Sequence, residues 1–203
     1  MSTQTAATAA ASGPWRRAAL AVLAALALSA FAAPASADHV HWESKALLKS
    51  FFSTSDKVTY IKVALTDAEL TELTGRLGYA PERREWTLFV GTTGGVVDGF
   101  AVIDNEKGQH LPITMAVLVS PDGVVKRQEL MVYREAYGEE IESLRFRTQF
   151  VGKGSRDAIR LGEDVVAVSG ATISSQAACR LVRRFVQLVE VLKPGHGPLL
   201  QKP

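Results

Sequence analysis

The sequence is almost without cysteine: its 203 residues include only Cys179. One cysteine forms no disulfide within the chain, and it does not complete a Cys-x-x-Cys-His haem site or a thiolate cluster around zinc or iron. His39 and His41 lie two residues apart, but the sequence identifies no further ligands beside them. We therefore expect no metal site, and we expect Cys179 to be a small buried side chain.

Long apolar runs are also scarce. The run Ala18–Ala33 has 16 residues, whereas a membrane-spanning helix requires about 20. An Arg-Arg pair precedes the run, Pro34 ends it, and Ala35-Ser36-Ala37 supplies the small residues that a signal peptidase requires. We predict that residues 1–37 are a cleaved signal peptide, with an uncleaved anchor as the alternative. The arginine pair leaves both the general secretory route and the twin-arginine route open.

The mature chain lacks a surplus of charge of either sign. The first 37 residues contain two of the 23 basic residues and none of the 21 acidic ones, which leaves 21 of each. No basic stripe with interleaved aromatic residues is present. The sequence therefore predicts no nucleic-acid partner.

The pattern of apolar and turn-forming residues predicts an α+β fold. Short strands joined by tight turns favour an antiparallel sheet, here packed by helices and followed by a C-terminal amphipathic helix. Strands are expected at 57–65, 85–91, 96–104, 112–120 and 124–133, and helices at 41–52, 67–78, 137–150 and 173–192. Thr66 and Glu69 form a capping-box pattern at the start of the second helix.

The chain divides near Pro81 and the charged "ERRE" that follows it. We predict an N-terminal helix-strand-helix extension over 38–82, a main domain over 83–193 and a C-terminal tail over 194–203. The main domain is expected to fold and to bind its ligand without the extension.

The stretch "AVSGATISS" at 167–175 places small and hydroxyl side chains directly before the last helix. It is either an elaborate helix start or a site where N–H groups and a hydroxyl meet an anion such as phosphate, because a helix N-terminus has unpartnered donors. Gly170 would allow a close approach, and Thr172 offers the hydroxyl. On the other side of this helix, Arg180, Arg183 and Arg184 are expected to form a solvated face.

Three stretches, in this order, resemble the FMN-binding domain family: "GQHLPITMAVLVSPDGVVKRQELMVYREAYGEEI", "RTQFVGK" and "SGATISS". The resemblance covers about 95–190 of the chain. The family includes flavin-carrying subunits of ion-pumping NADH:quinone and ferredoxin:NAD oxidoreductases, and related periplasmic proteins. It implies FMN as the cofactor, esterified through its phosphate to the threonine that ends Ser-Gly-Ala-Thr, here Thr172.

The resemblance also implies the other cofactor-binding residues. Ser169, Gly170, Ala171 and Ser174 accompany Thr172 at the attachment loop. Glu135 and Gly138 match the family's Glu-x-x-Gly element near the flavin ring, with a strand end and turn as the structural alternative. Tyr137 either stacks on the ring or packs in the core, and Lys153 either offsets the negative charge of the flavin or lies exposed in a loop.

One departure from the family pattern bears on the ester. The family usually has an aspartate six residues before the threonine, and this chain has Val166 there.

Taken together, these features predict an exported, extracytoplasmic electron-transfer flavoprotein. The alternative is a binding or docking module that holds FMN non-covalently or not at all. The expected partners are a flavin transferase and redox proteins at the membrane or in the periplasm. No catalytic residues are expected, because the chain is predicted to be an electron carrier or a subunit of an oxidoreductase system rather than a stand-alone enzyme.

Overall fold

The computed structural model of the protein describes residues 38–201, and the side chains of residues 38–193. The predicted signal peptide lies outside these described residues. So do the side chains of the predicted C-terminal tail.

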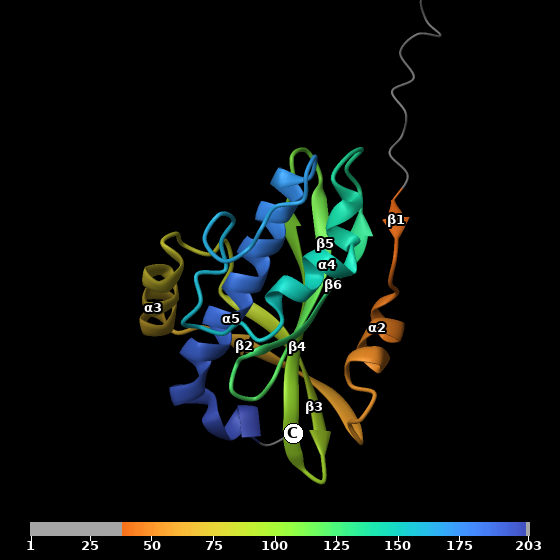
Figure 1. Ribbon diagram of the computed structural model, residues 1–203. Helices are drawn as coiled ribbons and strands as arrows, with labels where there is room; N and C mark the ends of the chain where they lie inside the picture. The colour runs from red at the N-terminus through yellow and green to blue at the C-terminus, as the bar shows by residue number, and fades with distance from the viewer. Residues whose placement is uncertain (1–37, 202–203) are drawn as a thin grey trace, which may run out of the picture. The chain divides into compact units, whose positions relative to one another are not determined.

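A six-stranded antiparallel sheet forms the centre of the fold (Figure 1); the antiparallel arrangement confirms the prediction, and β1 is a strand that the sequence did not indicate. Consecutive strands from β2 to β6 pair as neighbours, and β1 pairs with the free side of β6, which gives the order β1-β6-β5-β4-β3-β2. The strands are β1 (His39–Val40), β2 (Lys57–Ala64), β3 (Glu85–Thr93), β4 (Val96–Lys107), β5 (Pro112–Val119) and β6 (Val125–Tyr133). Gly94 and Gly95 both have positive φ in the tight turn between β3 and β4, a conformation that glycine adopts without steric cost.

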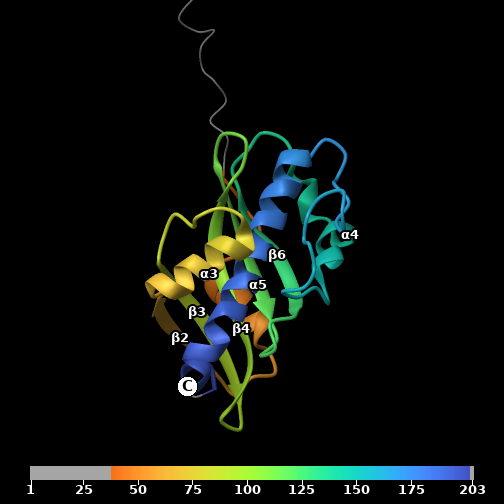
Figure 2. The same cartoon turned by 90° about the vertical axis from the view of Figure 1, so that its left-hand side faces the viewer.

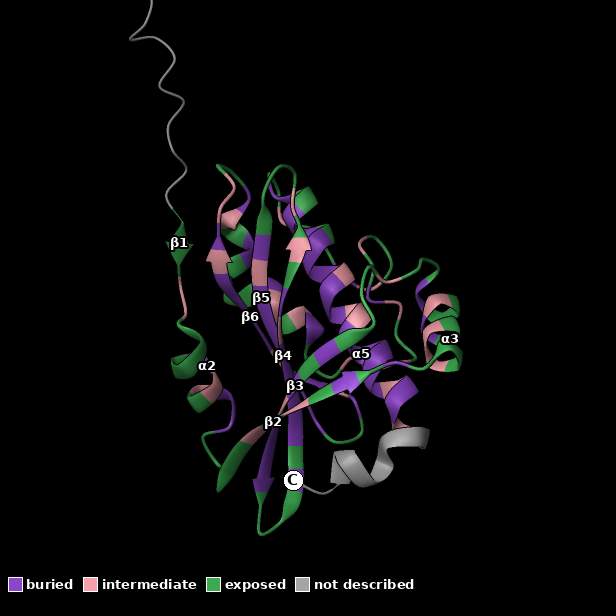
Figure 3. Ribbon diagram, turned by 180° about the vertical axis from the view of Figure 1, so that it is seen from behind, coloured by how far each residue is buried: buried purple, intermediate pink, exposed green. Residues whose placement is uncertain are grey.

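Helices cover both faces of the sheet. The long helix α5 (Thr172–Gln201) crosses β4 and β5 on one face, and α3 (Asp67–Leu77) lies beside it (Figure 2). The short helix α2 (Ser44–Phe51) packs on the opposite face through Leu47 and Phe51. The larger core therefore lies between the sheet and α5, where both the strands and the helix are coloured as buried in Figure 3.

Local signals explain the ends of α3. Thr66 accepts a hydrogen bond from the backbone N–H of Glu69, and the Glu69 side chain accepts one from Thr66, which completes the predicted capping box. Gly78 ends the helix in the left-handed conformation, with φ of 82°.

Two expected helices differ from the prediction. Residues 137–150 are not one helix but three short pieces, η2 (Glu139–Glu142), α4 (Leu144–Arg147) and η3 (Thr148–Phe150). The extended backbone of Ser143, with ψ of 136°, interrupts the helical path between η2 and α4. The last helix begins at Thr172 and continues to Gln201, beyond the expected end at Leu192.

The arginines of α5 do not form the predicted solvated face. Arg184 has only 13% of its side chain exposed and pairs with two carboxylates on β4, while Arg183 donates to the last carbonyl groups of α3. The prediction was wrong because the charge pattern of a helix does not reveal which acidic strand lies opposite it.

The predicted extension contributes to the same sheet and core as the predicted main domain. β2 pairs with β3 along its whole length, and Val63, Leu65, Leu73 and Leu77 belong to the core cluster that includes α5. The boundary at residue 82 stays a prediction, although packing is continuous across it.

Candidate functional site

The stretch before α5 folds into a tight turn. The N–H of Ala171 donates to the carbonyl of Val168 at 3.0 Å, and Gly170 in this turn has φ of 80°. A side chain built on Gly170 would meet no atom within 4 Å, so glycine is required by the backbone conformation. The turn delivers Thr172 as the first residue of the helix, with its side chain exposed.

Among the described residues, no side chain caps the N-terminus of α5. Its first helical hydrogen bond joins the N–H of Ser175 to the carbonyl of Ala171, so the alanine occupies the capping position and offers no acceptor. The N–H groups of Thr172, Ile173 and Ser174 consequently have no hydrogen-bond partner among the described residues. Exposed helical N–H groups at the positive end of the helix dipole suit an anion.

A cleft with a volume of about 220 Å³ lies at this helix end. Its walls come from the turn after β4, the segment after β6 and the start of α5. The lining residues are Gln109, Glu135, Tyr137, Gly170, Ala171, Thr172, Ile173 and Ser174. Three segments distant in sequence thus meet around the Thr172 hydroxyl.

Glu135 anchors one wall of the cleft. Its Oε1 accepts hydrogen bonds from the backbone N–H groups of His110, at 2.6 Å, and Leu111, at 2.9 Å. Burial raises the pKa of Glu135, but the N–H donors of Leu111 and His110 outweigh it and hold that pKa below its usual value. Glu135 is therefore a carboxylate at neutral pH, and it fixes the turn between β4 and β5.

A hydrogen-bonded chain joins the start of α5 to the segment that carries Tyr137. The hydroxyl groups of Tyr133 and Ser174 lie 2.7 Å apart, and the Tyr133 hydroxyl also donates to the carbonyl of Tyr137. Gly138 has φ of 100°, and a Cβ there would lie 2.5 Å from the Ser174 hydroxyl and 2.7 Å from that of Tyr133. The Tyr137 side chain is 87% exposed at the cleft, which excludes the alternative that it packs in the core.

Comparison with known families identifies this region. The model of the FMN-binding domain family matches residues 108–187, a range that contains every residue lining the cleft. Residues 108–187 therefore match an FMN-binding domain.

Solved structures and curated proteins add little to this match. The crystal structure of NqrC from Shewanella oneidensis is similar to the chain, with 18% sequence identity and a TM-score of 0.43, and the similarity covers 69% of this chain and 87% of that one. No curated protein matches the chain.

The cleft brings most of the predicted site residues together. Glu135, Tyr137, Gly170, Ala171, Thr172 and Ser174 line the cleft. Gly138 lies against the Ser174 hydroxyl. Ser169 lies exposed in the turn before the helix and does not line the cleft.

Lys153 also lies outside the cleft lining. Its ammonium group is 3.0 Å from Asp164 Oδ2, and the same carboxylate accepts hydrogen bonds from the N–H groups of Ile159 and Arg160. Burial by itself would raise the pKa of Asp164. The hydrogen bond from the N–H of Arg160 and the Lys153 ammonium have the larger combined effect, and they lower this pKa below its usual value. In this structure Lys153 orders the segment that leads into the attachment loop.

Sequence reasoning missed Gln109 and Ile173 in the cleft, and Gln149 behind the attachment loop. The Gln149 amide exchanges two hydrogen bonds with the backbone of Val166, at 2.8 and 3.1 Å. Val166 itself is 72% exposed. No local pattern marks Gln149 or Gln109, because their roles depend on contacts between distant segments.

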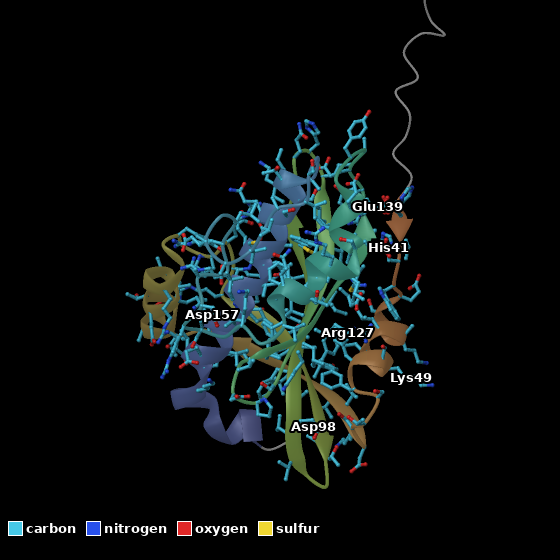
Figure 4. All side chains as sticks on the ribbon, viewed as in Figure 1. His41, Lys49, Asp98, Arg127, Glu139 and Asp157 are labelled. Atoms are coloured by element: carbon cyan, nitrogen blue, oxygen red, sulfur yellow. The ribbon has the colours of Figure 1, made fainter. Side chains whose placement is uncertain are left out.

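Across residues 38–193, no three or more His, Cys, Asp and Glu side chains are grouped so as to hold a metal ion. His39 and His41 instead pair with Glu139 of η2. Figure 4 labels His41 and Glu139. No helix in the described part of the chain has the length and apolar character needed to cross a membrane.

Proposed function

We propose that the protein is an exported electron-transfer flavoprotein whose FMN is esterified through its phosphate to Thr172. One observation carries this proposal: the exposed Thr172 hydroxyl lies at an uncapped helix N-terminus within the FMN-binding domain. In the ester Thr172 Oγ1 would replace one oxygen-linked substituent on the phosphorus of the flavin phosphate, and the hydroxyl proton would leave with the displaced group.

The residues of the cleft fit the cofactor. The unpartnered N–H groups of Thr172, Ile173 and Ser174 would donate to the phosphate oxygens. Tyr137, whose ring is exposed, would stack against the flavin ring. Glu135 would keep the turn that carries Gln109 in place beside it. When bound, FMN accepts one or two electrons, and the protein supplies binding, orientation and tuning.

The openness of the attachment loop supports maturation by a partner enzyme. Ser169, Gly170, Thr172 and Ile173 are all exposed, so a flavin transferase would reach the hydroxyl without unfolding the domain. A covalent bond would also retain the flavin outside the cytoplasm, where the signal-like residues 1–37 would direct the chain. The redox partners would be proteins at the membrane or in the periplasm.

Replacement of the threonine tests the ester. Wild-type protein co-expressed with an exported flavin transferase should carry one FMN through denaturation, seen as in-gel fluorescence and as added mass. Thr172→Val keeps the shape but removes the oxygen, so it should carry none. Thr87→Val, at an exposed threonine on β3, is the matched control and should label fully. Fluorescence of Thr172→Val on the denaturing gel would place the attachment at another residue.

The alternative is a module that holds FMN without the ester, or not at all, and Val166 is the observation that favours it. Because the Val166 side chain is exposed and Gln149 holds only its backbone, Val166→Asp should leave the fold unchanged. If wild type releases flavin on denaturation and Val166→Asp retains it, the aspartate is what the transferase requires. If neither wild type nor Val166→Asp retains flavin on denaturation, FMN is not esterified to this chain.

A further inference from the structure

A second cavity, with a volume of about 210 Å³, lies along α5 away from the flavin cleft. Its lining includes Trp86 of β3, the β4 segment from Asp104 to Lys107, and Arg180 and Arg184 of α5. Arg180 and Arg184 follow Thr172 by eight and twelve residues, so they lie about 12 and 18 Å along the helix from it. Thr172 does not line this cavity.

Two of the three acidic side chains of the cavity wall, those of Asp104 and Glu106, are already paired. Asp104 accepts from Arg83 at 2.7 Å and from Arg184 at 3.0 Å. Glu106 accepts from Arg184 at 2.6 Å and from Arg180 at 3.0 Å. Three guanidinium groups therefore face two carboxylates, which leaves one positive charge in excess.

Further donors in the lining have no partner. The Trp86 side chain is 3% exposed, and its indole N–H is buried without a hydrogen-bond partner in the part of the chain that the structure describes. Lys107 is exposed and its ammonium forms no ion pair with any described residue. A buried unpaired N–H costs free energy, so a bound acceptor would stabilise it. One acidic lining residue, Glu82, has no described ion pair and is exposed, so the four basic lining residues still exceed the three acidic ones.

Two guanidinium groups lie over the aromatic ring of Trp86. The Arg83 guanidinium lies 4.2 Å from the ring centroid, and that of Arg184 lies 5.8 Å from it. These cations already occupy positions that favour cation–π contact. The cavity therefore suits a ligand rich in acceptors better than a ring that stacks.

We propose that this cavity is a second binding site, for a small organic anion that bears a carboxylate or phosphate group. The anion accepts the Trp86 indole hydrogen and places its charge between Lys107 and Arg83. The cavity volume lies below the usual range for drug-sized ligands, about 300–1,000 Å³, so the ligand is small. The proposal is independent of the flavin ester.

The NMR chemical shifts of the tryptophan indole N–H groups test the site. Sodium phosphate and sodium succinate are titrated separately into the ¹⁵N-labelled protein at constant ionic strength, and each tryptophan is assigned by the signal lost in its Phe variant. We expect a saturable shift for Trp86 with at least one probe, and none for Trp42. A response to phosphate alone or to succinate alone identifies which of the two anionic groups the site selects.

Charge variants show where the anion lies. Lys107→Gln and Arg83→Gln should each weaken binding about tenfold, because each removes a charged partner of the anion. Lys62→Gln, at an exposed lysine on β2, should leave the affinity unchanged. Thr172→Val should also leave it unchanged, which separates this test from that of the ester. The absence of a saturable Trp86 shift with both probes, or unchanged affinity in both charge variants, would overturn the proposal.

Discussion

At the scale of single residues, two glycines shape the flavin cleft for different reasons. Gly170 has open space around its Cα and is required by its positive φ alone. Gly138 combines a positive φ with the close approach of the Ser174 and Tyr133 hydroxyl groups. A side chain at Gly138 would therefore disturb both the backbone and the hydrogen-bonded chain behind Thr172.

Gly138→Ala should destabilise the protein. The left-handed conformation alone costs a non-glycine residue about 1–2 kcal/mol, and displacement of the Ser174 hydroxyl adds to that loss. Gly75→Ala is the matched control, since Gly75 lies in α3 with no atom within 4 Å of a new Cβ. That control should raise stability by up to about 1 kcal/mol. Urea unfolding of both variants measures the effects, and equal stability of Gly138→Ala and wild type would contradict this account of the cleft.

At the scale of elements, the sequence predicts well what is decided locally. The capping box of α3 and the start of α5 follow from neighbouring residues, and both are found. The α+β class and the antiparallel sheet follow from short strands joined by tight turns. Glu135, Tyr137 and Gly138 were identified through the family resemblance, because no periodic pattern distinguishes them.

What the sequence could not provide depends on pairing between distant elements. The helical pattern of the sequence predicts that Arg184 is solvated. In the structure, Arg184 pairs with Asp104 and Glu106 of β4. The break of 137–150 into short pieces depends on Ser143, whose extended backbone no apolar spacing indicates. Gln109 lines the cleft from a turn whose backbone N–H groups donate to Glu135, a residue distant in sequence that follows β6.

The turn between β4 and β5 should respond to pH through Glu135. Its pKa is lowered in the folded protein, so it contributes stability that is present above its unfolded pKa, about 4.3, and is lost as the pH falls through the folded value. Glu135→Gln keeps an acceptor oxygen but loses the charge, so it should cost about 1 kcal/mol at pH 7.

The difference between Glu135→Gln and wild type should shrink as the carboxylate is protonated in acid. Urea unfolding at a series of pH values measures it. Glu85→Gln, at an exposed residue of β3, serves as the control and should show no comparable loss at pH 7. A loss for Glu135→Gln that is the same at pH 7 and pH 3 would show that its charge does not stabilise the turn.

At the scale of the whole molecule, export should produce a chain that begins at Asp38. Cleavage after Ala37 leaves β1 intact, and β1 pairs with β6 from His39 onward. N-terminal sequencing and intact mass of the exported protein should both give Asp38. Recovery of a chain that begins at Met1 or Ser2 in the membrane fraction would identify residues 1–37 as an anchor.

The shared core changes what we expect when residues 38–82 are removed. β3 would become an unpaired edge, and the core would lose Val63, Leu65, Leu73 and Leu77. Burial of each such side chain contributes about 1.5–3 kcal/mol, so the four together contribute about 6–12 kcal/mol. That sum is comparable to the whole stability of a typical domain, about 5–15 kcal/mol. We therefore expect a chain that starts at residue 83 not to fold.

A shorter deletion separates loss of the core from loss of the N-terminus as such. Removal of residues 38–40 takes away only β1, whose two residues are exposed, and should lower the melting temperature little. Circular dichroism and thermal melting compare the two deletions with the mature chain. A cooperative transition in the protein that starts at residue 83 would show that β3 to α5 suffice for the fold, and that residue 82 is a true domain boundary in spite of the continuous packing.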